Sequence, residues 1–381
     1  MTVTGIICEY NPFHNGHKKQ LDAVRSLRGQ EEGIVCLMSG HFVQRGAPAI
    51  LDKTLRAKAA VLCGADLVLE LPVTAALSSA EGFAAGGVSI LSSFCDALCF
   101  GAEQAEKEPL LQTAEALLRP AFSDALRQQL EKGLSFPAAR QAALTAMGID
   151  GTLLTAPNNI LAVEYTKAIL TQGSSMELLP ITREGGYHDL LPQQENPSAT
   201  ALRQLMPDGN WRSYMPEAAA DCFAGAAIHT LAAGERTILC KLRCMEDREF
   251  EALPYGSEGL WRKLMHACRS KATLEEILTS VKSKRYTRTR LDRMVMCAFL
   301  GITEAMLAQK PPYTRVLALN DRGREILKKA REHGLFPNLG QTVDSPWQPL
   351  ETRCGSLYGL FAESQPEAPD SESNRRLFYT P

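Results

Sequence analysis

Gly5-Ile6-Ile7-Cys8-Glu9-Tyr10-Asn11-Pro12-Phe13-His14-Asn15-Gly16-His17-Lys18-Lys19-Gln20 is the stretch that decides the fold. Its apolar start is long enough for one buried strand, and Asn11-Pro12 marks a turn. Two histidines then open a helix, where free backbone N–H groups and the helix dipole favour an anion. Positions three apart share a helix face, so His14 and His17 can address one group, and Gly16 has no side chain to obstruct it. The stretch therefore predicts a strand, a turn and an anion-binding helix start.

The composition is that of an ordinary globular chain, long enough at 381 residues for two domains. The formal net charge of -2 excludes a global field that attracts nucleic acid, so RNA contact must come from a local basic patch. No apolar stretch approaches the roughly 20 residues that cross a bilayer, and the start does not resemble a signal peptide. The 11 cysteines include no C-x-x-C pair, which favours reduced thiols. We predict a cytoplasmic protein with no membrane contact and no dedicated metal site.

Buried strands alternate with helices after the opening stretch. Strands are expected at 33–38, 67–71, 96–100 and 176–181, with helices at 52–63, 79–92, 110–118, 123–132, 136–147 and from Pro157. Continuously apolar strands of this kind predict an α/β fold with a Rossmann-like parallel sheet covered on both faces. Ligands of such sheets lie beyond the carboxyl ends of the strands, so the histidine turn, the loop 39–46, Gly101 and Arg183 should share one rim.

A second phosphate-shaped site follows the fifth strand and a loop at Gly185–Asp189. Ser198 or Thr200 can cap a short helix, and Arg203 falls in its first turns. Hydroxyls, free N–H groups and a guanidinium together suit a phosphate. A plain helix cap is the alternative, but its pairing with the two histidines in one chain favours a phosphate site.

From about residue 215 the pattern changes to helices without clear strands. We predict a nucleotide-binding domain over 1–212 with a helical insertion at about 104–156, a mainly helical RNA-binding region over 213–362, and a flexible tail over 363–381. Within the helical region a basic cluster interleaved with Tyr286 suits a phosphate backbone, the alternative being a solvated helix face. The predicted RNA contacts are Lys282, Lys284, Arg285, Arg288, Arg290 and Arg293.

The H-x-G-H pattern after a first strand resembles the nucleotidyltransferase superfamily, in which the imidazoles donate hydrogen bonds to ATP phosphates. More specifically, the chain resembles the bacterial tRNA(Met) cytidine acetate ligase family over roughly residues 1 to 330. The resemblance rests on the order and spacing of nine strings: EYNPFHNGH, MSGHFVQRG, DKTLRAKAA, GADLVLELP, CFGAE, PNNIL, ITREGGYHD, SATALR and PYTRVLALND.

The resemblance implies an enzyme that activates acetate with ATP to acetyl-adenylate. It then transfers the acetyl group to N4 of the wobble cytidine of elongator tRNA(Met). His14 and His17 would stabilise the α-phosphate transition state, and Arg183, Arg203 and Lys53 could hold the leaving pyrophosphate. Mg²⁺ is expected by analogy with phosphoryl chemistry, although the sequence shows no ligand cage. The implied ATP site comprises Ile7, Cys8, Glu9, Tyr10, Asn11, Pro12, Phe13, His14, Asn15, Gly16, His17, Lys18, Lys19, Gln20, Gly101, Asn158 and Arg183.

Two other readings of the residues stay open at this point. One is a small-molecule adenylyltransferase of the pantetheine-phosphate or nicotinamide-mononucleotide kind, which shares H-x-G-H but is usually much shorter and lacks a basic helical region. The other is a non-catalytic RNA-binding protein with a vestigial nucleotide fold. The intact pair His14 and His17 argues against this last reading, because a decayed site is not expected to keep both imidazoles.

Overall fold

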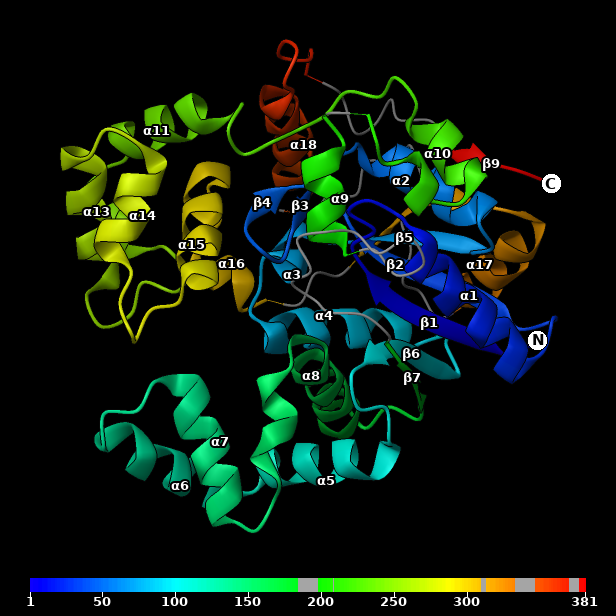
Figure 1. Ribbon diagram of the computed structural model, residues 1–381, viewed down its shortest axis with the longest axis horizontal. Coiled ribbons are helices and arrows are strands. Elements are labelled where there is room, and N and C mark those ends of the chain that lie inside the picture. The colour runs from blue at the N-terminus through cyan, green and yellow to red at the C-terminus, as the bar shows by residue number, and fades with distance from the viewer. Residues whose placement is uncertain (184–197, 208, 310–312, 333–346, 370–376) are drawn as a thin grey trace.

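A seven-stranded sheet forms the centre of the computed structural model, which describes residues 1–183, 198–207, 209–309, 313–332, 347–369 and 377–381 (Figure 1). The strand order is β7-β6-β1-β2-β5-β8-β9, and the five strands from β7 to β5 are parallel. Their bounds are β1 (Val3–Cys8), β2 (Gly33–Ser39), β5 (Leu67–Leu71), β6 (Ala97–Ala102) and β7 (Glu177–Thr182). Each lies within two residues of the strand that the sequence predicts.

Helices cover both faces of this sheet, which confirms the predicted α/β class. On one face lie α1 (Asn15–Arg28), α2 (Lys53–Leu62), α9 (Ala199–Leu205) and α10 (Glu217–Phe223), which share an apolar layer with the inward residues Ile6, Cys36 and Val68. On the other lie α4 (Ala80–Leu91), α8 (Pro157–Gln172) and α17 (Asp321–Glu332), which pack on Ile7, Leu37 and Leu69. Alternate residues of one strand thus enter opposite core layers.

The predicted helical insertion lies outside α8, at the bottom of Figure 1. It contains α5 (Lys107–Leu118), α6 (Pro120–Glu131), α7 (Phe136–Ala146) and a 3-10 turn, η1 (Gly151–Thr155). Phe122, Ala143 and Leu144 continue the same apolar cluster that packs on the sheet. The insertion therefore packs on α8, and its apolar residues do not cover the carboxyl ends of the strands.

A helical region occupies the left of Figure 1. Its core includes Phe42, Val73 and Leu77 from the first part of the chain, so the two regions share a continuous apolar contact. Its elements are α11 (Glu235–Cys244), α12 (Asp247–Glu251), α13 (Leu260–Ser270), α14 (Leu274–Val281), α15 (Arg288–Leu300), α16 (Glu304–Leu307), α18 (Trp347–Tyr358) and η3 (Gly359–Phe361), with β3 (Phe42–Val43), β4 (Ala47–Pro48) and α3 (Val73–Ala76) beside them. The 3-10 turn η2 (Arg212–Tyr214) packs instead with the apolar layer of α1 and α2.

Two late strands correct the expectation of helices without strands after residue 215. β8 (Arg315–Leu319) pairs antiparallel with β5, and β9 (Phe378–Tyr379) pairs with β8. The short apolar run in β8 fits a strand or a helix equally well, and only the open edge of β5 decides between them. Two described parts of the predicted tail contact the rest of the chain, since Glu367 contacts His229 and β9 joins the sheet, while the flexibility of the tail stays a prediction. The predicted loop Gly185–Asp189 and residues 370–376 of the tail lie outside the described residues.

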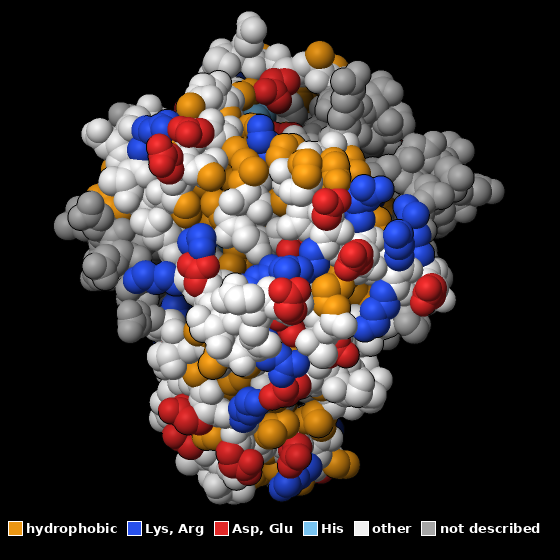
Figure 2. Space-filling model, turned by 90° about the vertical axis from the view of Figure 1, so that its right-hand side faces the viewer, with side chains coloured by type: hydrophobic (Ala, Val, Ile, Leu, Met, Phe, Trp, Pro, Cys, Tyr) orange, Lys and Arg blue, Asp and Glu red, His pale blue; other side chains and the backbone are white. Residues whose placement is uncertain are grey.

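Within the described ranges no helix is both long and apolar enough to cross a bilayer. The face shown in Figure 2 carries Lys and Arg side chains interspersed with Asp and Glu, so this face presents no extended field of one sign.

Candidate active site

The two histidines of the opening stretch form a reciprocal cap at the start of α1. His14 is the N-cap residue, and its Nδ1 accepts a hydrogen bond from the backbone N–H of Gly16 at 3.1 Å. Nδ1 of His17 in turn accepts from the backbone N–H of His14 at 3.3 Å. The rings stack with centroids 3.8 Å apart and an interplanar angle of 29°. The pattern is a capping box built from imidazoles, and it holds both rings in one orientation.

This geometry fixes the protonation of both rings. A backbone N–H always donates, so each Nδ1 is unprotonated and each Nε2 of the neutral ring carries the hydrogen. Burial and the charges of Arg183 and Arg203 lower the pKa of His14 from its ordinary value to about 3. Burial, His14 and Arg183 lower the pKa of His17 well below its usual range. The site therefore presents two neutral imidazoles with Nε2–H donors.

One of these two donors lacks a hydrogen-bond acceptor among the described residues. Nε2 of His14 is buried without a hydrogen-bond partner among the described residues. A buried unsatisfied donor costs about 1–3 kcal/mol and needs an explanation, which a bound acceptor provides.

Gly16 is required by the ring of His14. A Cβ at position 16 would lie 3.0 Å from Cε1 and 3.2 Å from Nδ1 of His14. Such contacts would push the imidazole out of the position in which it accepts the Gly16 N–H. The glycine of H-x-G-H thus serves the histidine directly, in addition to leaving room for a phosphate.

The second predicted phosphate site faces the histidine turn. Oγ of Ser198 caps α9 by accepting from the backbone N–H of Ala201 at 3.1 Å. Arg203 then reaches back to the first turn, where its guanidinium donates to the carbonyl of Asn11 at 2.8 Å and to the Thr200 hydroxyl at 3.1 Å. Arg203 therefore joins the start of α9 to the histidine turn, which lies far away in the sequence.

Arg183 is oriented by a chain of side chains from two other elements. Its guanidinium donates to Oδ1 of Asn158 at 3.2 Å, and Nδ2 of Asn158 donates to Glu103 at 2.7 Å. Glu103 also accepts the backbone N–H of Asn159 at 2.9 Å, at the start of α8. The carboxylate after β6 therefore fixes the amide that positions the arginine after β7.

These groups surround one cavity of about 440 Å³ at the carboxyl ends of β1, β6 and β7. Its lining includes Gly101, Asn158 and Arg183, most of the opening stretch, and the start of α9. From the sequence-predicted set the lining contains Ile7, Cys8, Glu9, Tyr10, Asn11, His14, Gly16, His17, Lys19, Gln20, Gly101, Asn158, Arg183, Ser198, Thr200 and Arg203. The structure thus brings together at one rim the two sites that the sequence places far apart.

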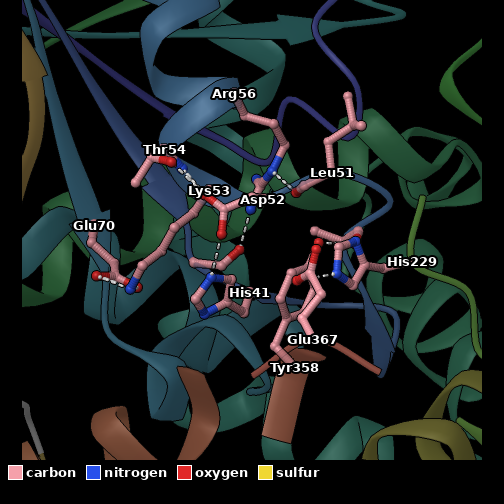
Figure 3. A network of polar contacts seen from close by, with 12 residues as sticks. His41, Leu51, Asp52, Lys53, Thr54, Arg56, Glu70, His229, Tyr358 and Glu367 are labelled. Carbon is pink, nitrogen blue, oxygen red and sulfur yellow. Dashed lines mark hydrogen bonds and ion pairs between the residues drawn. The ribbon is translucent and has the colours of Figure 1, made fainter. Parts of the chain in front are cut away.

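A buried arginine supports this rim from beneath (Figure 3). The guanidinium of Arg56, in α2, is fully buried and donates to the carbonyls of Glu9 at 2.7 Å and Ser39 at 3.1 Å, and also to that of Gly40. Its Nε donates to the carbonyl of Leu51 at 2.9 Å. Arg56 therefore ties the segments that follow β1 and β2 to one another.

Five predicted site residues lie away from the cavity. Lys53 is buried and forms an ion pair with Glu70 at 2.7 Å, as Figure 3 shows, so it does not reach the rim. Phe13 belongs to the core under α1, and Lys18 pairs with Asp22 on the surface. Pro12 and Asn15 do not line the cavity either. Four of these residues belong to the opening stretch and Lys53 belongs to α2, but their side chains do not line the cavity.

Comparison with known proteins agrees with this geometry. A model of the HIGH Nucleotidyl Transferase family matches residues 1–372. The tRNA(Met) cytidine acetate ligase of Alkaliphilus metalliredigens is 38% identical, with 94% of each chain covered, and that of Clostridium tetani is 36% identical, covering 94% of this chain and 96% of its own.

The chain belongs to the tRNA(Met) cytidine acetate ligase family. The apo crystal structure of Thermotoga maritima TmcAL superposes with a TM-score of 0.91 at 30% identity, covering all of both chains. The same protein bound with alpha-thio ATP gives a TM-score of 0.87 at 29% identity, again over all of both chains. The predicted family and fold are confirmed.

The cavity lining also contains residues that the sequence analysis did not name individually. Gln44 and Arg45 lie between β3 and β4, in the loop 39–46 that was predicted for this rim, and the backbone N–H of Gln44 donates to Glu9 at 2.9 Å. Phe83 and Tyr165 lie on α4 and α8, inside apolar helix faces, and nothing in the sequence distinguishes them from ordinary core residues.

The basic segment joins α14 to α15, and two of its six predicted cations form ion pairs with nearby acids. Both terminal nitrogens of Arg288 donate to Glu275, at 2.8 and 2.7 Å, and its Nε donates to Asp292 at 2.8 Å. Arg285 pairs with Glu258. Among the predicted contacts, only Lys282 and Lys284 are exposed with no ion pair in the described part of the chain.

The remaining arginines of the segment hold the helical region together. Arg290 donates to the carbonyl of Tyr255 at 2.7 Å and lies over the ring of Tyr286, while Arg293 lies over the ring of Tyr255. Tyr286 itself is buried, so its ring is not open on the surface for a base to stack on.

The described residues contain no cluster of three His, Cys, Asp or Glu side chains that could hold a metal ion. Glu9 is the carboxylate that lines the cavity, since Asp52 caps α2 and contacts His41 instead. One carboxylate beside a phosphate site suits Mg²⁺ that arrives on ATP, because Mg²⁺ keeps several waters and takes its other ligands from phosphates.

Proposed function

We propose that this chain is a tRNA(Met) cytidine acetate ligase that first joins acetate to AMP and then acetylates N4 of the wobble cytidine of elongator tRNA(Met). The observation that carries the first step is the unpartnered Nε2–H of His14, buried between a stacked second imidazole and the guanidinium charges of Arg183 and Arg203. Such a donor set suits a phosphate and has no structural use in the empty protein.

In this proposal the cavity binds ATP along its rim. The adenosine lies near Gly101, where a Cβ would meet nothing closer than 3.8 Å, so the strand end leaves space for it. The α-phosphate lies at the start of α1, facing the donors of His14 and His17. Ser198, Thr200, Arg183 and Arg203 face the β- and γ-phosphates. Glu9, which lines the cavity, is the carboxylate that would hold Mg²⁺ bound to ATP, and such an ion would neutralise phosphate charge.

Catalysis then follows from fixed donors. A carboxylate oxygen of acetate attacks the α-phosphorus, the new acyl-phosphate bond forms, and the bond to pyrophosphate breaks with its electron pair leaving on pyrophosphate. Negative charge grows on the phosphate oxygens during this step, and preorganised donors stabilise it more than they stabilise the ground state. The imidazoles act as neutral donors, because burial and, to a smaller extent, the nearby guanidinium charges lower their pKa values.

The second step needs tRNA and a different surface. The N4 amine of the cytidine attacks the acetyl carbonyl, the amide bond forms, and AMP leaves. We assign tRNA contact to the helical region 213–362, with Lys282 and Lys284 as the exposed cations. A tRNA-modifying enzyme of this kind works in the cytoplasm, where its substrates are.

The decisive experiment follows both products. The protein is incubated with ATP and labelled acetate, with and without tRNA, and acetyl-adenylate and acetylated RNA are separated and measured. Acetyl-adenylate without tRNA and labelled N4-acetylcytidine with tRNA support the proposal. Adenylylation of a phosphopantetheine or mononucleotide substrate, with no acetate-dependent product, would instead favour a small-molecule adenylyltransferase.

A further inference from the structure

The apolar residues of the cavity wall gather on one side of the sheet. Ile7, Phe83, Phe100 and Tyr165 all belong to the core layer between the sheet and helices α4 and α8, and Leu161 packs against that layer. The histidines and arginines come from the opposite face and from the rim. The cavity therefore has a charged mouth and an apolar inner end.

This apolar end is tightly bounded. The rings of Phe100 and Tyr165 are 5.6 Å apart. Ile7 is seated on Gly87 of α4, where a Cβ would lie 2.4 Å from its Cδ1. Phe83 is 3% exposed, so its ring is held by the core and contributes only an edge to the cavity. These contacts hold the wall residues of the apolar end in place.

Tyr165 brings a hydroxyl to this apolar end. Tyr165 is 5% exposed and lines the cavity, and its hydroxyl has no hydrogen-bond partner among the described residues. Burial, with Cys8 and Glu9 nearby, raises the pKa of Tyr165, so the phenol keeps its proton and acts as a donor. Burial also raises the pKa of the Cys8 thiol, which stays neutral beside it.

We propose that this apolar end, closed by Phe83 and Ile7 and carrying the Tyr165 hydroxyl, is the acetate subsite and sets the length of acid that the enzyme accepts. The inference rests on the proposed acetate ligase function. The methyl group of acetate packs on Phe83, Phe100 and Ile7, while the phenol donates to one carboxylate oxygen. The other oxygen stays free to attack the α-phosphorus at the mouth. The phenol keeps its proton throughout, and pyrophosphate departs with the electron pair.

Two variants test the two halves of the subsite in acetate-dependent ATP–pyrophosphate exchange. Tyr165→Phe removes only the donor and should raise the KM for acetate about tenfold or more, the scale of a hydrogen bond to a charged group, while changing the KM for ATP less than about twofold. Tyr313→Phe is the matched control, because it removes another unpartnered buried hydroxyl far from the cavity. It should leave both constants unchanged.

Phe83→Leu shortens the wall and should raise the rate ratio of propionate to acetate about tenfold, the discrimination expected for one methylene group. Phe122→Leu, which thins the same core layer in α6, should leave that ratio unchanged. A rise in the KM for ATP in either cavity variant would mean that the apolar end holds adenine, and would overturn the inference. Unchanged acetate constants and unchanged acid selectivity would overturn it as well.

The failure of the proposed function looks different. A wild-type protein that catalyses no acetate-dependent exchange would refute acetate activation itself, and the subsite with it. A wild-type protein that activates acetate, with variants that behave like their controls, would refute only the subsite.

Discussion

The start of α1 and the segment that enters α15 both attracted attention as binding sites, and the structure separates them. At α1, local hydrogen bonds consume each Nδ1 and leave a buried Nε2–H of His14 without a partner. At α15, nearby acids form ion pairs with two of the cations, since Arg285 pairs with Glu258 and Arg288 with Glu275. At the start of α1 an ordered donor is left without a hydrogen-bond partner in the fold. At the start of α15 most of the ordered cationic side chains already have partners in the fold.

The comparison teaches what identifies a ligand site. Charge density alone does not, because neighbouring chain can neutralise it in the fold. A buried donor that the fold orients but does not satisfy is a stronger sign, since leaving it unmade has a free-energy cost. Each of the following predictions probes one side of this contrast, beginning with the largest expected effect.

His14→Asn should separate the cap from the donor. Asparagine is among the best N-cap residues, so α1 keeps its cap, but the Nε2–H donor is lost. Acetate-dependent ATP–pyrophosphate exchange should fall about a hundredfold or more, the scale for one preorganised donor, while the thermal midpoint changes little. His266→Ala, an exposed histidine on α13, is the control. A near-wild-type exchange rate in His14→Asn would show that this imidazole only caps the helix.

Acidification should destabilise the ligand-free protein through His14. Its pKa is about 3 in the folded state, below the ordinary value near 6.5 of the unfolded chain, so the unfolded state binds the proton more readily between these values. The contribution is complete above about pH 6.5 and decreases as the pH falls. At pH 5 the loss should be about 2 kcal/mol. Denaturant unfolding at pH 7 and pH 5 measures it, and His14→Asn should lose less than wild type.

Gly101→Val should weaken nucleotide binding without disturbing the empty protein. The nearest atom to a Cβ at this position is Cβ of Arg183 at 3.8 Å, an ordinary contact, so the fold has space for the new side chain. That space is the proposed place of the adenosine, and filling it should weaken ATP binding about tenfold. Calorimetry gives the affinity, and thermal melts without ATP give the control. Unaltered ATP affinity would move the adenosine away from β6.

Replacing Lys282 and Lys284 together with alanine should have the smallest effect and should be confined to RNA. Each lost phosphate contact lowers the slope of log affinity against log salt by about one, so the double variant should lose about two units. Arg288→Ala should instead lower the thermal midpoint and leave that slope unchanged, because its guanidinium is held by Glu275 and Asp292. Acetyl-adenylate formation should survive in both. An unchanged slope in the lysine variant would place the RNA surface elsewhere.

The sequence by itself determined the local elements of the nucleotide-binding half. Apolar runs bounded by turn residues predicted β1, β2 and β5, and Ser198 was one of the two residues predicted to cap α9. That cap is present, and Asp52 and Ser79 cap α2 and α4 in the same way, because a side chain that accepts an N–H two or three residues ahead needs only its own neighbours. The spacing of His14 and His17 likewise placed two imidazoles on one face.

Only the tertiary structure decided which of these groups meet. Arg203 reaches the carbonyl of Asn11 because α9 packs beside α1. Lys53 does not line the cavity because it forms an ion pair with Glu70 of strand β5. β8 is a strand because β5 offers it an open edge, and Tyr165 becomes a cavity residue because α8 covers the end of β1. These outcomes depend on residues far apart in the chain, and local patterns carry no information about such pairings.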